Sequence, residues 1–114
     1  SFKGKKQKEI DRILNDTKLL ENAGVFSIVL ECVETKLSKQ ITKNIKIPTI
    51  GIGSSSNCDG QVLVIDDLIG LSDSKFKFVK KYVDLSRIIN SAVKKYKNEV
   101  KNKQFPKAKH SFAN

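Results

Sequence analysis

Residues 25–34 read VFSIVLECVE, an apolar run of strand-forming residues that ends in a carboxylate, Glu31, followed by Cys32. A continuous apolar run of this length is typical of a strand in a parallel sheet that is covered on both faces. A charged group at the end of such a strand must be exposed at its tip, paired, or used for chemistry. The run therefore predicts a buried strand over 25–30 and makes Glu31 the first candidate site residue.

Amphipathic helices are predicted on both sides of this strand. Residues 6–22 and 34–45 carry apolar side chains at helical spacing with charged residues between them. Gly24 follows the first helix and is expected to end it in a left-handed conformation. The apolar positions are Ile10, Ile13, Leu14 and Leu20 in the first helix, and Leu37, Ile41 and Ile45 in the second.

The same alternation continues toward the C-terminus. Residues 45–53 read as a second buried strand, which the chain enters through Pro48. Residues 59–71 have the β-branched content of a strand, but only about eight residues separate them from the preceding strand, and a parallel crossover needs about a dozen. We therefore expect a helix there, with Asp59 as its N-cap.

A third strand is expected over 75–83, with Phe76, Phe78 and Tyr82 on one side. A last helix over 85–102 is expected to bury its apolar stripe, and the tail after it to be irregular. The fold class is thus α/β, built from repeated βα units around a parallel sheet. The predicted stripe consists of Ile89, Ala92, Val93, Tyr96 and Val100.

Composition restricts the function classes. The 114 residues allow at most one domain, and no apolar stretch approaches the roughly 20 residues that span a bilayer. The N-terminal residues lack the apolar core of a signal peptide, and two scattered cysteines favour a reduced, cytoplasmic protein. The net charge of +10 comes from 20 lysines and only two arginines, Arg12 and Arg87, which disfavours nucleic acid as a partner.

Four motifs occur in one order along the chain: IVLECV, IPTIGIGSSSNCDGQVLVIDDLIGL, KFVKKYVDL and the tail FPKAKHSF. Together they resemble ketopantoate hydroxymethyltransferase, also called 3-methyl-2-oxobutanoate hydroxymethyltransferase. The resemblance implies a TIM (β/α)8 barrel of the phosphoenolpyruvate/pyruvate class. Residues 1–114 are then the C-terminal part of a single barrel domain, a helix followed by about three βα units and a tail, which is incomplete in this chain.

The resemblance also implies a reaction. A hydroxymethyl group passes from methylenetetrahydrofolate to 3-methyl-2-oxobutanoate and gives ketopantoate, in pantothenate biosynthesis. Mg²⁺ chelates the keto acid, and the base that removes its proton is the glutamate of the LEC motif, here Glu31. No part of this chain matches the Mg²⁺ ligands of the family. We therefore expect them in a missing N-terminal half, and expect the isolated chain to be inactive. Homo-oligomers, usually decamers, are implied.

The GIGSSS segment (51–56) lacks the dinucleotide fingerprint and the Walker lysine. In the family this loop lies at the mouth of the active site, which makes Gly53 and Ser54 predicted contacts of the folate co-substrate; a tight turn is the alternative. Cys32 is expected to be a packing residue, and His110 part of a docking tail. Two further functions remain open: a non-catalytic structural remnant of the enzyme, and a basic nucleic-acid-binding module.

Overall fold

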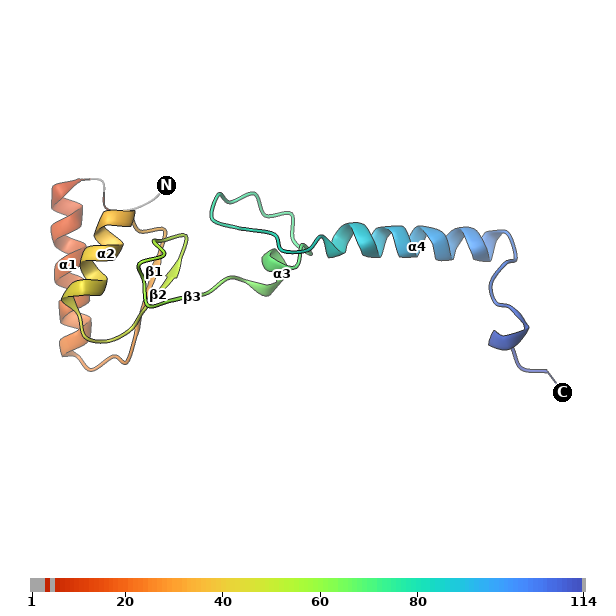
Figure 1. The fold of residues 1–114 in the computed structure, drawn as a ribbon, viewed down its shortest axis with the longest axis horizontal. Coiled ribbons are helices and arrows are strands. Elements are labelled where there is room, and N and C mark those ends of the chain that lie inside the picture. The colour runs from red at the N-terminus through yellow and green to blue at the C-terminus, as the bar shows by residue number, and fades with distance from the viewer. Residues whose placement is uncertain (1–3, 5, 114) are drawn as a thin grey trace. The chain divides into compact units, whose positions relative to one another are not determined.

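The computed structural model describes residue 4 and residues 6–113 (Figure 1). The chain divides into two compact units. The first comprises the described residues up to Val64 together with Lys75–Lys80, and the second comprises Ile65–Ser74 and the described residues from Lys81 onward.

The first unit is built on a small parallel sheet. Along the chain it contains α1 (Gln7–Asn22), β1 (Ile28–Glu31), α2 (Thr35–Asn44), β2 (Thr49–Ile52) and β3 (Gly60–Gln61). The strand order is β1-β2-β3, and both pairs are parallel. Ile28 pairs with Thr49 and Glu31 with Ile52, so β1 and β2 end side by side. The predicted α/β class with a parallel sheet is confirmed.

The connection from α1 to β1 follows the predicted signals. Gly24 has a φ of +94°, and its N–H donates to the carbonyl of Glu21 at 3.0 Å. The Val25 N–H donates to the carbonyl of Leu20 at 3.4 Å, so the last carbonyls of α1 are satisfied within the turn. Glycine reaches this left-handed conformation without a Cβ clash, which is why the helix ends here.

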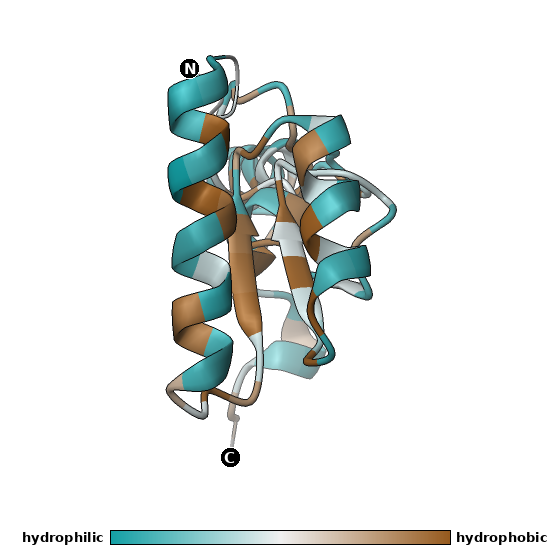
Figure 2. Cartoon of the chain, turned by 90° about the vertical axis from the view of Figure 1, so that its left-hand side faces the viewer, coloured by the Kyte–Doolittle hydropathy of each residue, from teal (hydrophilic) through white to brown (hydrophobic). Residues whose placement is uncertain are grey.

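The core lies between the sheet and the two helices. Leu37, Ile41 and Ile45, the predicted stripe of the second helix, are all buried, together with Ile28 and Leu30 of β1. From α1, the predicted Ile10, Ile13 and Leu14 pack against this cluster while remaining partly exposed. Figure 2 shows much of the apolar surface of α1 and α2, in brown, on the sides of the helices that face the strands. The predicted Leu20 is 45% exposed and does not join the core.

The expectation that β1 is covered on both faces is wrong for this chain. Ile28 and Leu30 are buried, but Val29 is 60% exposed and Glu31 is exposed. Successive side chains of a strand point to opposite faces, and only the face toward α1 and α2 is covered by the described residues. We call the other face, which carries Val29, Glu31, Ile50 and Ile52, the open face of the sheet.

The helix predicted over 59–71 is largely wrong. Gly60–Gln61 form β3, and only Ile65–Leu68 are helical (α3). The connection from β2 to β3 is short, and side-chain hydrogen bonds stabilise it. The Asp59 carboxylate accepts from the Thr49 N–H at 2.9 Å, and the Asp59 N–H donates to the Thr49 hydroxyl at 3.1 Å. Asp59 therefore ties β3 to the start of β2 and caps no helix.

The strand predicted over 75–83 is also absent. The Val79 N–H donates to the carbonyl of Phe76 at 3.1 Å, a three-residue closure that an extended strand cannot make. The rings of Phe76 and Phe78 do lie on one side, but they stack on each other, with centroids 5.4 Å apart and planes 7° from parallel. The third strand of the sheet is β3 instead.

The second unit contains α3, α4 (Leu85–Lys101) and a 3₁₀ turn, η1 (Ala108–His110). Asp84 begins α4 by accepting from the Arg87 N–H at 3.4 Å. The position of α4 is as predicted, but the expected burial of its stripe is wrong: no residue of α4 is buried, and Tyr96 is 58% exposed. No helix among the described residues is long and apolar enough to cross a membrane.

Glu21 joins the end of α1 to the segment that follows α2. Its carboxylate accepts from the Lys46 N–H at 2.6 Å and meets the Lys18 ammonium at 3.2 Å. The hydrogen bond from the Lys46 N–H is the largest effect. Together with the contact with Lys18 it outweighs desolvation, so the pKa of Glu21 lies below its ordinary value.

This lowered pKa predicts an acid-dependent loss of stability. The carboxylate stabilises the first unit above the ordinary pKa of a glutamate, and this contribution disappears as the pH falls through the lower, folded-state value. Urea unfolding, followed through the amide signals of β1 as the pH is lowered, should show a smaller acid-induced loss in Glu21→Gln than in the parent. Asp16→Asn, which removes an exposed carboxylate from the same helix, should leave the parent's pH dependence unchanged. Equal pH profiles for Glu21→Gln and the parent would contradict the assignment.

Candidate functional site

Glu31 is the last residue of β1 and lies where β1 and β2 end together. Its side chain is exposed, on the open face of the sheet. Among the described residues, no side-chain hydrogen bond or ion pair to its carboxylate is found. Its position is therefore set by the backbone around it.

That backbone makes an unusual turn directly after the strand. Cys32 has a φ of +53°, which is rare for a residue with a Cβ. Its N–H donates to the carbonyl of Ile52 at 2.9 Å and so continues the pairing with β2. The chain then turns into α2, where the Glu34 carboxylate accepts from the Leu37 N–H at 3.1 Å and caps the helix.

Ser54, predicted as a co-substrate contact, lies against this turn. Its hydroxyl donates to the carbonyl of Leu30 at 2.7 Å and accepts from the Val33 N–H at 3.1 Å. A single hydroxyl from the loop after β2 thus bridges the peptide groups on either side of Glu31 and Cys32. The structure brings Ser54 together with the backbone of the candidate base.

Gly53 lies at the same strand ends and has a φ of +66°. A Cβ at this position would lie 2.8 Å from the Phe78 ring and 3.2 Å from the Cys32 sulfur. The absence of a side chain is what lets the ring approach the loop. The Cys32 thiol is free and half-buried in this contact, as expected for a packing residue.

Phe78 was not among the residues predicted for the site. The alternation of Phe76 and Phe78 suggested a strand, and no local signal indicates that residues 75–80 return to the end of β2. Long-range packing alone brings them there. The lysine-rich composition of KFKFVK, with no acidic residue between 75 and 80, is the sequence feature that distinguishes this segment from a buried strand.

The rest of the loop after β2 is ordered by its own side chains. The buried Ser55 hydroxyl accepts from the Asn57 N–H at 3.0 Å and from the Asn57 side chain at 2.9 Å. The Gln61 amide donates to the Ser55 carbonyl at 2.9 Å. These bonds give residues 53–61 a defined shape and explain how so short a connection reaches β3.

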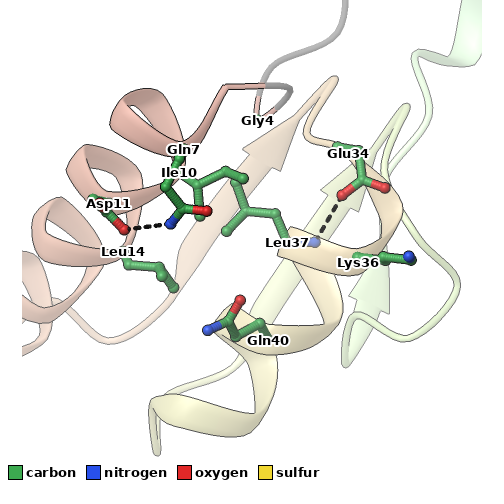
Figure 3. A pocket seen from close by; sticks show the side chains of 9 residues that line it. All are labelled: Gly4, Gln7, Ile10, Asp11, Leu14, Glu34, Lys36, Leu37 and Gln40. Atoms are coloured by element: carbon green, nitrogen blue, oxygen red, sulfur yellow. Dashed lines mark hydrogen bonds between the residues drawn. The ribbon is translucent and has the colours of Figure 1, made fainter.

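Two other features lie apart from this cluster. His110 belongs to the second unit, where its ring lies 5.0 Å from the ring of Phe105. A groove of about 740 Å³ between α1 and α2 has Ile10, Leu14 and Leu37 in its lining (Figure 3). None of Glu31, Gly53 and Ser54 lines that groove, so it is not the candidate site.

The described residues do not by themselves fit a magnesium site. Mg²⁺ prefers several oxygen ligands around one position. No three carboxylate, histidine or cysteine side chains gather anywhere in the described part of the chain. These side chains alone therefore do not hold the ion.

This arrangement occurs in one broad class of proteins. A carboxylate at the carboxyl end of a parallel strand, beside a glycine-containing loop, is the arrangement of α/β enzymes that work at the carboxyl ends of their strands. A carboxylate held there can accept a proton from a bound substrate.

The comparisons with known proteins specify the family. A sequence model described as ketopantoate hydroxymethyltransferase matches residues 1–108. The chain is 60% identical over 111 residues to the 3-methyl-2-oxobutanoate hydroxymethyltransferase of Pelagibacter ubique, covering 97% of this chain and 43% of that protein. The enzyme of the same name from Carboxydothermus hydrogenoformans is 54% identical over 110 residues, covering 96% of this chain and 40% of the relative.

The chain belongs to the ketopantoate hydroxymethyltransferase family. This confirms the resemblance carried by the four motifs. The chain spans about two-fifths of the length of the curated relatives it matches.

The geometry at Gly53 predicts the effect of adding one methyl group. Gly53→Ala meets both the positive φ and the Phe78 ring, whereas Gly24→Ala meets a positive φ with no atom within 4 Å. Strain of about 1 kcal/mol is expected from the conformation alone, and more at Gly53. Chemical denaturation should therefore show a larger loss for Gly53→Ala, accompanied by shifts in the Phe78 ring signals. Equal losses with unmoved Phe78 signals would contradict the contact.

Proposed function

We propose that this chain forms the carboxyl-terminal part of an enzyme that transfers a hydroxymethyl group from methylenetetrahydrofolate to 3-methyl-2-oxobutanoate, giving ketopantoate in pantothenate biosynthesis. The observation that carries the proposal is the position of Glu31. In a chain of this family, it is an exposed carboxylate at the carboxyl end of β1, beside the end of β2. The catalytic base of the reaction is Glu31.

The proposed step is a proton transfer. One carboxylate oxygen of Glu31 takes the proton from C3 of the keto acid, and the electron pair of the broken C–H bond moves toward the carbonyl to form an enolate. C3 then forms the new carbon–carbon bond to the one-carbon unit. Overall, both carbon–nitrogen bonds of the one-carbon unit break and water supplies its hydroxyl group. The proton taken from C3 and the second proton of water end on the two nitrogens of the tetrahydrofolate that leaves.

The remaining parts of the site are proposed to come from sequence that the relatives have beyond the matched region. A (β/α)8 barrel would cover the open face of the sheet, on which Val29 and Ile50 are not buried. The Mg²⁺ ligands would lie on its other strands. Residues 1–114 would then be one part of a single barrel domain, in a homo-oligomer that the family resemblance makes a decamer.

The folate co-substrate is proposed to contact the loop at Gly53 and Ser54. This loop lies against the turn after Glu31, so a ligand there is adjacent to the base. Because the Ser54 hydroxyl already holds two backbone groups, the contact would be made through the loop backbone. Gly53 suits such an approach because it lacks a side chain.

A chimaera tests the proposed base. This chain replaces the matched region of the Pelagibacter ubique relative, and ketopantoate formation is measured with both substrates. We expect turnover, and a loss of roughly 10²- to 10⁴-fold in kcat for Glu31→Gln, which keeps the shape of the side chain but cannot act as the base. Glu99→Gln, the same change on α4, should retain parental activity. A Glu31→Gln chimaera as active as its parent would refute the role of Glu31. An inactive but folded parent chimaera would instead favour the structural remnant.

The 114-residue chain without the rest of the barrel is predicted to be inactive. Its Glu31 is exposed to water, and the described residues hold no magnesium ligand set beside it. The purified chain should therefore show no ketopantoate formation above a protein-free control when Mg²⁺ and both substrates are present. Turnover equal to that of the chimaera would show that the chain needs no further part of the barrel.

A further inference from the structure

We propose that Ser54 is a positioning residue for Glu31: its hydroxyl holds the turn from which the carboxylate projects. This inference rests on the proposed function, because it assigns Ser54 a role in proton removal by Glu31. It goes beyond that function by naming a residue that acts on the base through the backbone.

The hydrogen bonds are placed as such a role requires. The Ser54 hydroxyl donates to the carbonyl of Leu30, the residue before Glu31, at 2.7 Å. It accepts from the N–H of Val33, the residue after Cys32, at 3.1 Å. The two backbone groups flank the Glu31–Cys32 pair, so one side chain fixes both ends of the segment that carries the base.

The turn needs such support. Cys32 has a φ of +53°, a left-handed conformation that costs an L-residue about 1 kcal/mol or more. The Cys32 N–H bonds to the Ile52 carbonyl, and the Ser54 hydroxyl adds one bond to the Leu30 carbonyl and one from the Val33 N–H. Loss of the hydroxyl removes both of its bonds, and the turn can then shift toward a commoner conformation.

Relaxation would move the base. No described side chain bonds to the Glu31 carboxylate, so the backbone alone directs it. A shift of about 1 Å between reacting groups can lower a rate by as much as a hundredfold. A change in the turn should therefore slow proton removal while leaving substrate affinity nearly unchanged.

The test isolates the proton-transfer step in the chimaera. The exchange of the C3 hydrogen of 3-methyl-2-oxobutanoate with deuterium is measured in D₂O without folate, as a function of keto-acid concentration. We expect Ser54→Ala to lower kcat for exchange roughly ten- to hundredfold with KM changed less than about twofold. Ser56→Ala, which alters an exposed serine of the same loop, should match the parent.

An isosteric pair separates the hydroxyl from general packing. Ser54→Thr keeps the hydroxyl and Ser54→Val replaces it by a methyl group in a side chain of the same shape. The exchange kcat of the threonine variant should exceed that of the valine variant by about tenfold at similar KM. This comparison also serves if Ser54→Ala fails to fold. Equal kcat values for the threonine and valine variants would overturn the proposal.

Running Glu31→Gln in parallel separates the two proposals. Loss of exchange in Glu31→Gln together with parental exchange in Ser54→Ala would overturn the positioning role and leave the base in place. Parental exchange in Glu31→Gln would refute the base and the positioning role with it. Loss in both, with the kcat and KM pattern described, supports both.

Discussion

The parallel pairing of β1 with β2 is the constraint on which the rest of the first unit depends. Its register places Glu31 opposite Ile52, so both strands end at one level. The turn after β1 and the loop after β2 therefore begin next to each other, and hydrogen bonds join them. The Ser54 hydroxyl, in the loop after β2, bonds to the backbone on both sides of the turn after β1. The missing side chain of Gly53 leaves room for the Phe78 ring close to Cys32. The residues of the candidate site lie close together because the two strands end side by side.

The parts of this arrangement that follow from local pattern were predictable from the sequence. Leu37, Ile41 and Ile45 repeat every four residues, and this period specifies both a helix and its buried side. Gly24 marks the end of α1 because few other residues adopt its conformation at low cost. The placement of Glu31 at a strand end followed from the abrupt change from apolar residues to a carboxylate. Each of these signals lies within a few residues of the feature it specifies.

The features that the sequence did not reveal depend on contacts across longer separations. Asp59 looks like a helix cap in isolation, yet its carboxylate bonds to Thr49, ten residues earlier. That bond permits a parallel strand after a connection that would ordinarily be too short. Phe78 alternates with Phe76 as strand residues do, but its ring packs against Gly53, 25 residues away. No periodicity reports such a contact. The same holds for the two bonds of Ser54, whose loop looked only like a glycine-rich turn.

The left-handed backbone at position 32 also limits which residues can stand next to the candidate base. Glycine would relieve the strain, and asparagine tolerates this conformation better than most residues do. Valine and isoleucine would raise the strain, because their branched Cβ crowds the neighbouring carbonyl. The backbone conformation at position 32, rather than the chemistry of the thiol, thus limits which residues can stand beside Glu31. Related chains that lack cysteine at this position should then carry residues that tolerate a left-handed backbone, such as glycine or asparagine.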